Sequence, residues 1–351
     1  MCMVKRIALA LILLAIIIAA FLASKVLLPN GNDDAKAKYL YVYSGRNTRA
    51  HVMQTIRDSQ LLRSPLLFER VAEALDVWDR IRPGRYELSK STTILNLARR
   101  LRNGTQSPVD LTITKIRTKE QLASMIGKRF ETDSASMIRF LSSPDSVGRF
   151  ELDTNTVMAA VFPDTYTYRW TATPSTIFEK LHAQYKKIWT SERKQKAEAQ
   201  GLTPIQTYIL ASIIEEETNV DDEKGNMASV YMNRLKKGMR LGADPTVKFA
   251  LRDFDLRRIY QKHLQVESPY NTYRNTGLPP GPICTPSLKT VDAVLNAPQT
   301  EYLYFVAKSD FSQRHVFTTN YADHLKFARE YQVALNARQN KGTSTAKDII
   351  E

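Results

Sequence analysis

The sequence predicts a mixed α+β protein with one N-terminal transmembrane helix, a small α/β module and a larger domain of helices and strands. An apolar run near the N-terminus, alternating short strand and helix patterns over 39–113, and helical apolar spacing after residue 118 support this prediction. The 351 residues suffice for one large domain or two ordinary ones. We expect a cytoplasmic tail at 1–6, a membrane helix at 7–28, a tether at 29–38, the module at 39–113, the larger domain at 114–345 and a tail at 346–351.

The membrane helix is predicted from 18 uncharged residues, Ile7 to Ser24, followed beyond Lys25 by further apolar residues. This length fits a single span, which needs about 20 residues. Lys5 and Arg6 precede the span, so the positive-inside rule places the N-terminus in the cytoplasm and the rest of the chain outside. A cleaved signal peptide is the alternative, but the run is long for one and lacks a clear A-x-A site. We expect a single-pass protein of the cell membrane (the inner membrane of a Gram-negative cell) with a periplasmic or extracytoplasmic domain.

The net charge of +14 indicates an anionic partner. The basic residues are spread along the chain, no nucleic-acid-binding motif accompanies them, and a nucleic-acid partner does not fit a domain outside the membrane. Lipid headgroups and cell wall remain as anionic partners. Cys2 and Cys284 would lie on opposite sides of the membrane and should not pair. No histidine or cysteine cluster has metal-ligand spacing, so we expect neither a metal nor a cofactor.

The module at 39–113 is expected to alternate strands with helices. A helix capped by Ser91 should end at Asn103-Gly104 by helix-termination chemistry. The other predicted elements are a strand over Tyr39–Tyr43, two helices between Thr48 and Leu75 broken near Ser64-Pro65, a strand near Ile81–Leu88 and a closing strand over Val109–Ile113. The module carries no catalytic constellation, so binding or spacing is its simplest role.

A helix that ends in three consecutive glutamates is the main candidate for chemistry. Thr203, Pro204 and Gln206 form a capping-box start, and the helix then runs to Glu217. Each residue turns the helix by about 100°, so three consecutive carboxylates cannot share one face.

Helical phase separates the three carboxylates. Glu215 falls on the stripe of Tyr208 and Ala211, whereas Glu217 points roughly the opposite way, alongside Leu210. A carboxyl group that emerges from an apolar helix can be partly desolvated, which raises its pKa toward the range that general acid catalysis needs. The alternative is a frayed helix end with solvated glutamates.

Three loops rich in polar and aromatic residues follow this helix. They lie around Asp244-Pro-Thr246, Ser268–Tyr273 and Gly277–Pro282. Proline and glycine fix loop geometry, and amide, hydroxyl and aromatic groups bind sugar rings. Ordinary turn chemistry explains any one of these loops, but three of them so close to a helix-borne carboxylate favour a binding cleft.

Taken together and in their order along the chain, the motifs resemble those of the YceG-like family of endolytic murein transglycosylases. The matching segments are Phe162–Tyr166, Leu210–Thr218, Asn233–Leu235 with Gly238-Met239, Asp244–Val247, Ser268–Tyr273, Gly277–Ile283, Tyr302–Ala307 and His315–Phe317. The resemblance covers nearly the whole chain and implies a LysM-like module at 39–113 and a YceG-like catalytic domain at 114–345. The sequence departs from the family pattern at two positions. Gly242 stands where glutamine is usual, and Ala250 stands where a glycine or a similar residue is expected after the Asp-Pro-Thr strand.

The resemblance implies cleavage of the bond between N-acetylmuramic acid and N-acetylglucosamine in nascent peptidoglycan, which would end glycan elongation. It places catalysis on Glu215, which would protonate the glycosidic oxygen and then deprotonate the muramyl C6 hydroxyl to close a 1,6-anhydro ring. One carboxylate then suffices, whereas ordinary glycosidases need two. The residues expected to bind substrate are Glu217, Asn233, Asp244, Thr246, Tyr270, Asn271 and Tyr273.

The expected partners are glycan strands, the membrane and a peptidoglycan synthase. Two other functions remain open at this point. One is a non-catalytic, membrane-anchored scaffold that binds peptidoglycan, and the other is a hydrolase that uses water and leaves reducing ends.

Overall fold

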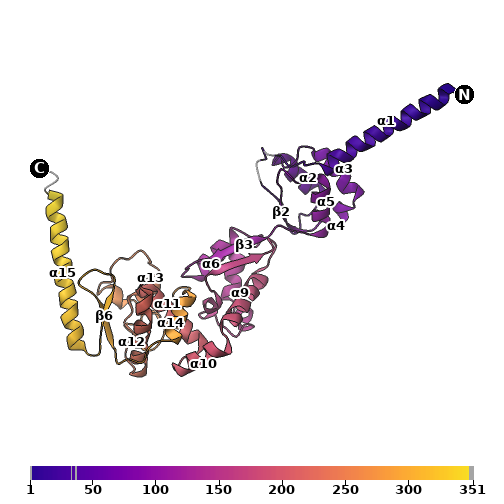
Figure 1. The fold of residues 1–351 in the computed structure, drawn as a ribbon. Helices are drawn as coiled ribbons and strands as arrows, with labels where there is room; N and C mark the ends of the chain where they lie inside the picture. Colours follow the sequence, from indigo (N-terminus) through magenta and orange to yellow (C-terminus); the bar gives the residue numbers. More distant parts are fainter. Residues whose placement is uncertain (1, 33, 36–37, 348–351) are drawn as a thin grey trace. The chain divides into compact units, whose positions relative to one another are not determined.

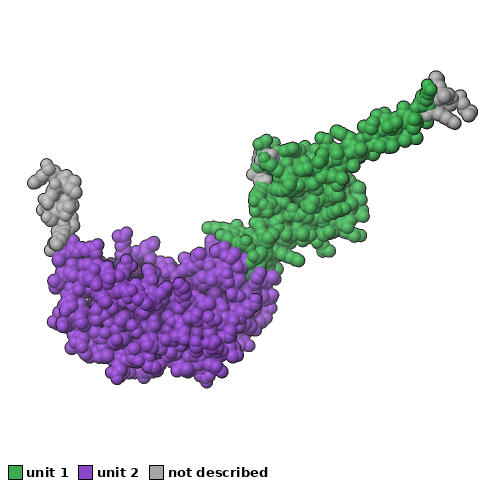
Figure 2. Space-filling model, in the orientation of Figure 1, with its two compact units in different colours: residues 1–111, 126–133, 167–173 green, residues 112–125, 134–166, 174–351 purple. Residues whose placement is uncertain are grey.

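The computed structural model describes residues 2–32, 34–35 and 38–347. Helices and short antiparallel strands make up these residues, which confirms the predicted α+β class. The chain forms two compact units (Figures 1 and 2), an N-terminal unit of residues 1–111, 126–133 and 167–173, and a C-terminal unit of residues 112–125, 134–166 and 174–351. Parts of the expected tether (33 and 36–37) and of the expected C-terminal tail (348–351) lie outside the described residues.

The first helix, α1 (Cys2–Leu27), contains the predicted span. Its segment Arg6–Leu27 is long and apolar enough to cross a membrane. The large apolar side chains along it, such as Ile12 and Ile16, are exposed, because the rest of the chain does not cover them. An exposed apolar helix of this length gains stability only where lipid or another apolar partner surrounds it.

The segment that follows α1 is bound to the module, whereas the sequence predicted a free tether. The backbone N–H groups of Asn30 and Gly31 donate to the carbonyl oxygen of Thr92 at 2.9 and 3.2 Å. The amide of Asn32 donates to the Leu61 carbonyl at 3.1 Å. The polar groups of this segment pair with neighbouring loops, as a polar composition allows.

The N-terminal unit is built around a two-stranded sheet. Strands β1 (Tyr39–Val42) and β2 (Gly84–Glu87) pair antiparallel, with Leu40 opposite Tyr86, and both of these side chains are fully buried. The helices of this unit are α2 (Arg49–Asp58), α3 (Pro65–Ala74), α4 (Val77–Arg80) and α5 (Ile94–Asn103). The predicted helix break near Ser64-Pro65 is confirmed.

Two predicted details of this module are wrong. The N-cap of α5 is Thr93, which accepts from the Asn96 amide at 3.1 Å, and not Ser91. The strand β3 (Val109–Ile113) pairs with β4 (Asp164–Tyr168), and not with the strands of the module. The division between the two units falls within both β3 and β4. A partner more than fifty residues away in sequence is invisible to a local pattern.

The C-terminal unit contains most of the helices and a third antiparallel pair, β5 with β6. The helices here are α6 (Lys119–Gly127), α7 (Ser134–Ser142), α8 (Pro144–Gly148), α9 (Pro174–Ile188), α10 (Ser191–Ala199), α11 (Pro204–Glu217), α12 (Lys224–Lys236), α13 (Asp244–Leu251), α14 (Leu288–Leu295) and α15 (Tyr321–Lys347). The short 3-10 helices are η1 (Val157–Ala160), η2 (Asp221–Glu223) and η3 (His263–Gln265), and the strands are β5 (Tyr304–Ala307) and β6 (His315–Thr318). The Asp-Pro-Thr segment, expected as a strand, begins α13, because proline suits the first helical turn.

Helix α11 forms the centre of the C-terminal core. Every residue from Thr207 to Ile214 is buried, and the helix packs against α12, α13 and α14. The predicted capping box is confirmed, since the Thr203 hydroxyl accepts from the Gln206 amide and the Gln206 side chain accepts from the Thr203 amide. This cap begins the helix at a defined residue and so fixes which residues form its last turn.

We predict that Thr203→Ala lowers the free energy of unfolding by about 1 kcal/mol, because the first turn of α11 loses its cap. Chemical denaturation monitored by circular dichroism measures this change. Thr319→Ala, at an exposed threonine outside any helix, is the matched control and should change stability by less than about 0.5 kcal/mol. Equal effects of the two substitutions would contradict a capping role for Thr203.

Candidate active site

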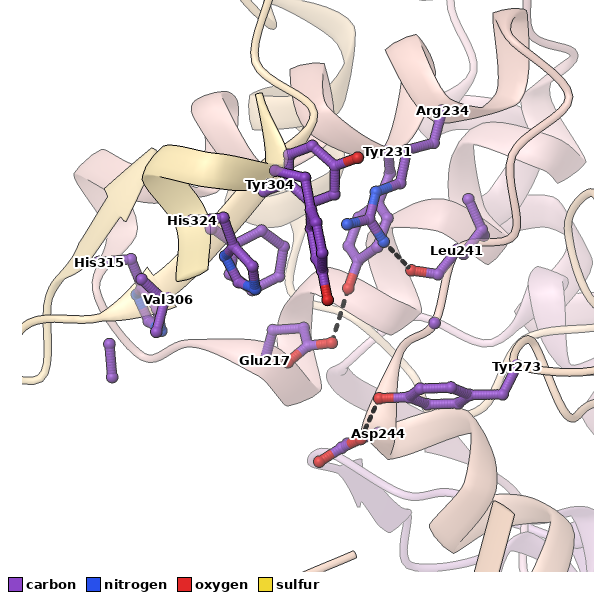
Figure 3. Close-up of a pocket in the computed structure, with 14 residues that line it drawn as sticks. Glu217, Tyr231, Arg234, Leu241, Asp244, Tyr273, Tyr304, Val306, His315 and His324 are labelled. Atoms are coloured by element: carbon purple, nitrogen blue, oxygen red, sulfur yellow. Dashed lines mark hydrogen bonds between the residues drawn. The ribbon is translucent and has the colours of Figure 1, made fainter. Parts of the chain in front are cut away.

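A cavity of about 430 Å³ lies in the C-terminal unit at the end of α11 (Figure 3). Its walls come from α11, α12, the loop before α13, β5, β6 and the start of α15. The lining residues are Glu217, Tyr231, Arg234, Leu241, Gly242, Asp244, Tyr273, Tyr304, Phe305, Val306, Ala307, His315, Tyr321 and His324. A cavity of this size is within the range of small-molecule and sugar sites.

Glu217, the last residue of α11, is one of two carboxylate residues that line this cavity, the other being Asp244. The pKa of Glu217 is raised from an ordinary value of 4.5 to about 7, mainly by burial and in part by the nearby Asp244 charge. The Tyr231 hydroxyl donates to Glu217 Oε1 at 2.7 Å and offsets part of this rise (Figure 3). At neutral pH the group can therefore hold a proton and release it, as an acid/base residue must.

Glu215 lies outside the cavity lining and is held by other side chains. Its Oε2 accepts from Ser287 Oγ at 3.1 Å and from the Thr290 hydroxyl, both at the start of α14. The Lys224 ammonium, itself buried, lies 3.4 Å from the same oxygen. This carboxylate therefore joins α11 to α14 and α12, and the geometry does not bring it to the cavity that Glu217 lines.

The middle glutamate, Glu216, points in a third direction. Its carboxylate lies 3.2 Å from Lys115 Nζ and 2.8 Å from Arg117 Nη2, so it forms ion pairs with the segment before α6. The helical-phase argument correctly separated the three glutamates. The structure adds that only Glu217 reaches the cavity.

Asp244 and Tyr273 are the other predicted site residues that the structure brings to this cavity. Tyr273 donates its hydroxyl proton to Asp244 Oδ1 at 2.6 Å (Figure 3), and burial raises the Tyr273 pKa. Gly242 lines the wall beside them with a φ of 59°, a conformation that favours glycine. A glutamine here, as the family pattern has, would face backbone strain as well as narrow this wall.

Four of the predicted substrate-binding residues lie outside the cavity lining. The Asn233 amide donates to the carbonyl oxygens of Thr300 and Tyr302. Thr246 and Asn271 are fully buried and hydrogen-bonded within the loops, and Tyr270 packs on Phe249 with a centroid distance of 4.7 Å. These side chains hold the loops in shape, so polar composition correctly indicated ordered loops but not which residues face the cavity.

Several lining residues were not singled out from the sequence. Tyr304 and His324 have nearly parallel rings 5.3 Å apart, and the Arg234 guanidinium lies 5.2 Å from the Tyr304 ring centre. Tyr304 belongs to β5, all of which is only partly buried. His324 lies one turn inside a helix, where a single histidine gives no signal.

We predict that Glu217→Gln stabilises the protein above pH 7 and not near pH 4. Because the folded-state pKa lies above the ordinary value, wild-type stability is fully present below about pH 4.5 and is lost as pH rises through 7. The variant has no carboxyl group at position 217 and does not lose this stability. Its unfolding free energy relative to the wild type should therefore increase by on the order of 2 kcal/mol between these pH values. Denaturant titrations at several pH values measure it. The exposed Glu301→Gln is the control, and a pH-independent difference for Glu217→Gln would contradict the raised pKa.

Several known proteins are similar to this chain over most of its length. An endolytic murein transglycosylase from Bacillus subtilis (strain 168) is 28% identical over 339 residues, covering 92% of this chain and 93% of that protein. One from Streptococcus pneumoniae (strain R6) is 26% identical over 344 residues, covering 87% of this chain and 60% of that protein. The crystal structure of a YceG-like protein from Listeria monocytogenes is 25% identical, with a TM-score of 0.53 over 82% of this chain and 97% of that one. Residues 40–330 match the YceG-like family, and the chain belongs to this family.

Proposed function

We propose that this protein is an endolytic lytic transglycosylase that cleaves the bond between N-acetylmuramic acid and N-acetylglucosamine in nascent peptidoglycan. The observation that carries this proposal is Glu217, a carboxyl group with a pKa near neutrality in a cavity walled by aromatic and polar side chains. The names of the relatives support murein as the substrate and an endolytic cut. Cleavage of nascent strands would end their elongation.

We propose Glu217, in place of Glu215, as the acid/base residue. Protonated Glu217 donates its proton to the glycosidic oxygen while the bond from that oxygen to muramyl C1 breaks. The resulting carboxylate accepts the proton of the muramyl C6 hydroxyl as its oxygen bonds to C1. The products are a 1,6-anhydro end and a free N-acetylglucosamine hydroxyl, and no water is consumed. A pKa of about 7 suits both steps, since one group must give up and regain the same proton.

Other lining groups fit the remaining needs of this reaction. The Asp244 carboxylate supplies negative charge to the cavity, which stabilises the positive charge that develops at C1 when the bond breaks. The aromatic rings of Tyr304 and Tyr321 offer flat apolar surfaces against which sugar rings pack. Arg234 supplies a cation for the carboxylates that peptidoglycan carries.

Two other functions make different predictions. A hydrolase would use Asp244 as the second carboxylate, with water as the nucleophile, and would leave reducing ends. A non-catalytic scaffold would bind peptidoglycan without cleaving it, and Glu217 would then have no role in product formation. The desolvated carboxyl group favours an enzyme, because a scaffold gains nothing from the cost of burying it.

We predict that Glu217→Gln lowers the rate of anhydro-muropeptide formation by about 10²–10⁴-fold, because the proton donor is lost. The measurement is digestion of purified sacculi by the full chain in detergent, with products analysed by mass spectrometry. Glu215→Gln is the matched control, and its main effect should be a loss of stability on the order of 1–3 kcal/mol, because Lys224 loses a partner.

The outcomes separate the hypotheses. Loss of activity in Glu215→Gln with retention in Glu217→Gln would restore the assignment made from the sequence. Reducing ends in place of anhydro ends would favour the hydrolase, and no cleavage by the wild type would favour the scaffold.

We also propose that α1 is a retained anchor with a cytoplasmic N-terminus, which leaves the chain after α1 outside the membrane. The apolar length of Arg6–Leu27 and the positive charges that precede it support this topology. The N-terminal module, LysM-like by resemblance, would bind glycan, and a peptidoglycan synthase is a fitting partner for an enzyme that cuts new strands.

The retained anchor makes its own prediction. In bacterial cells the protein should remain in carbonate-washed membranes at the mass of the full sequence, because the apolar helix stays in the bilayer. Intact-mass analysis of the membrane fraction measures this. A shorter chain that starts after the apolar run and is found in the soluble fraction would show a cleaved signal peptide instead.

A further inference from the structure

A buried carboxylate that does not itself line the cavity holds one of the histidines that do. Glu223, the last residue of η2, is 5% exposed. Its Oε2 lies 3.0 Å from His315 Nδ1, and both carboxylate oxygens accept from the His315 backbone N–H, at 3.0 and 3.2 Å. His315 is the first residue of β6 and lines the cavity beside Val306 (Figure 3).

This contact sets the tautomer of the neutral histidine. A carboxylate can only accept hydrogen bonds, so the nitrogen that faces it, Nδ1, carries the proton. In neutral His315 the other nitrogen, Nε2, then has a free lone pair. Among the described residues, the hydrogen bonds of His315 run through Nδ1 and its backbone N–H and not through Nε2. The arrangement parallels other sites in which a carboxylate sets the tautomer and direction of a working imidazole.

His315 lies in the same cavity wall as Tyr231, the residue whose hydroxyl holds Glu217. The Phe305 ring lies 5.6 Å from His315 and 5.8 Å from Tyr231, centre to centre, with near-perpendicular planes in both pairs. Tyr231 in turn donates to Glu217. A change in the His315 ring therefore alters the wall of the cavity and not a remote surface.

We propose that Glu223 is a positioning residue, which orients His315 so that Nε2 accepts a hydrogen bond from a hydroxyl or an acetamido N–H of the bound glycan. This inference rests on the proposed function. Tyr304 and Arg234 contribute hydrogen-bond donors to the cavity, and in the neutral ring an oriented Nε2 adds an acceptor. Peptidoglycan sugars carry many O–H and N–H donors, which such an acceptor recognises without adding charge. Proton transfer stays with Glu217.

The test compares Glu223→Leu, which removes the acceptor, with Glu223→Gln, which keeps one acceptor oxygen. Loss of one substrate hydrogen bond should raise KM about five- to tenfold in Glu223→Leu with kcat within about twofold, because the contact is made before and during the reaction. Glu223→Gln should show a smaller rise. Asp222→Asn is the matched control, since this neighbour pairs with Arg314 at the surface and should leave KM unchanged.

The tautomer of the His315 ring provides a measurement that would not change if Glu223 had a purely structural role. In ¹⁵N-histidine NMR spectra the wild-type His315 ring should carry its proton on Nδ1, and Glu223→Leu should shift it toward Nε2. The His315→Gln variant assigns the signal by its absence. Its amide oxygen can replace the Nε2 acceptor without help from Glu223, so adding Glu223→Leu to His315→Gln should raise KM no further.

Three results would overturn the inference while the proposed function stands. These are an Nε2-protonated ring in the active wild type, an unchanged KM in a folded Glu223→Leu, or equal KM effects of Glu223→Leu in the wild-type and His315→Gln backgrounds. Thermal denaturation shows whether Glu223→Leu is folded, and Glu223→Gln replaces it if not. Absence of any cleavage by the wild type would instead reject the proposed function on which the inference rests.

Discussion

The site depends on one constraint, namely that a helix buried on every side ends in three consecutive carboxylates. Burying a carboxylate without a partner is costly, so each of the three must find its own compensation. Glu215 is paired with Lys224, and Glu216 with Lys115 and Arg117. Glu217 has the neutral hydroxyl of Tyr231, and no lysine or arginine among the described residues forms an ion pair with it. Burial is therefore least compensated at Glu217, and its pKa rises to about 7.

Under the proposed function, this difference in partners separates two structural glutamates from the one that carries the chemistry within a single helical turn. The two ion-paired glutamates bind α11 to α12, α14 and the segment before α6, and so hold the end of the helix in place. A helix end fixed in this way keeps Glu217 in one position against the cavity. Preorganisation of this kind lets a single carboxyl group give and regain a proton with little rearrangement. A further buried acid, Glu223, holds the ring of His315, which lines the cavity.

Much of the fold could be predicted from the sequence, because capping, apolar spacing and helix breaks are local. The start of α11 at Thr203 and the break before Pro65 are confirmed examples. Which glutamate lines the cavity could not be predicted by phase. Helical phase identifies an inward face only when the opposite face is solvated, and α11 is buried all round. The partners that decide the matter, Lys224, Thr290 and Tyr231, lie on other elements and are brought close only by tertiary packing. The pairing of β3 with β4 was missed for the same reason.

The central claim is that Glu217, and not its neighbour two residues earlier, meets the scissile bond. The most direct measurement is a crystal structure of the inactive Glu217→Gln variant with a peptidoglycan glycan fragment bound. The account predicts that the fragment occupies the cavity between Tyr273 and Tyr304, with a glycosidic oxygen within hydrogen-bond distance of the side-chain amide introduced at position 217. A glycosidic oxygen bound to Glu215, or a glycan bound away from this cavity, would contradict it.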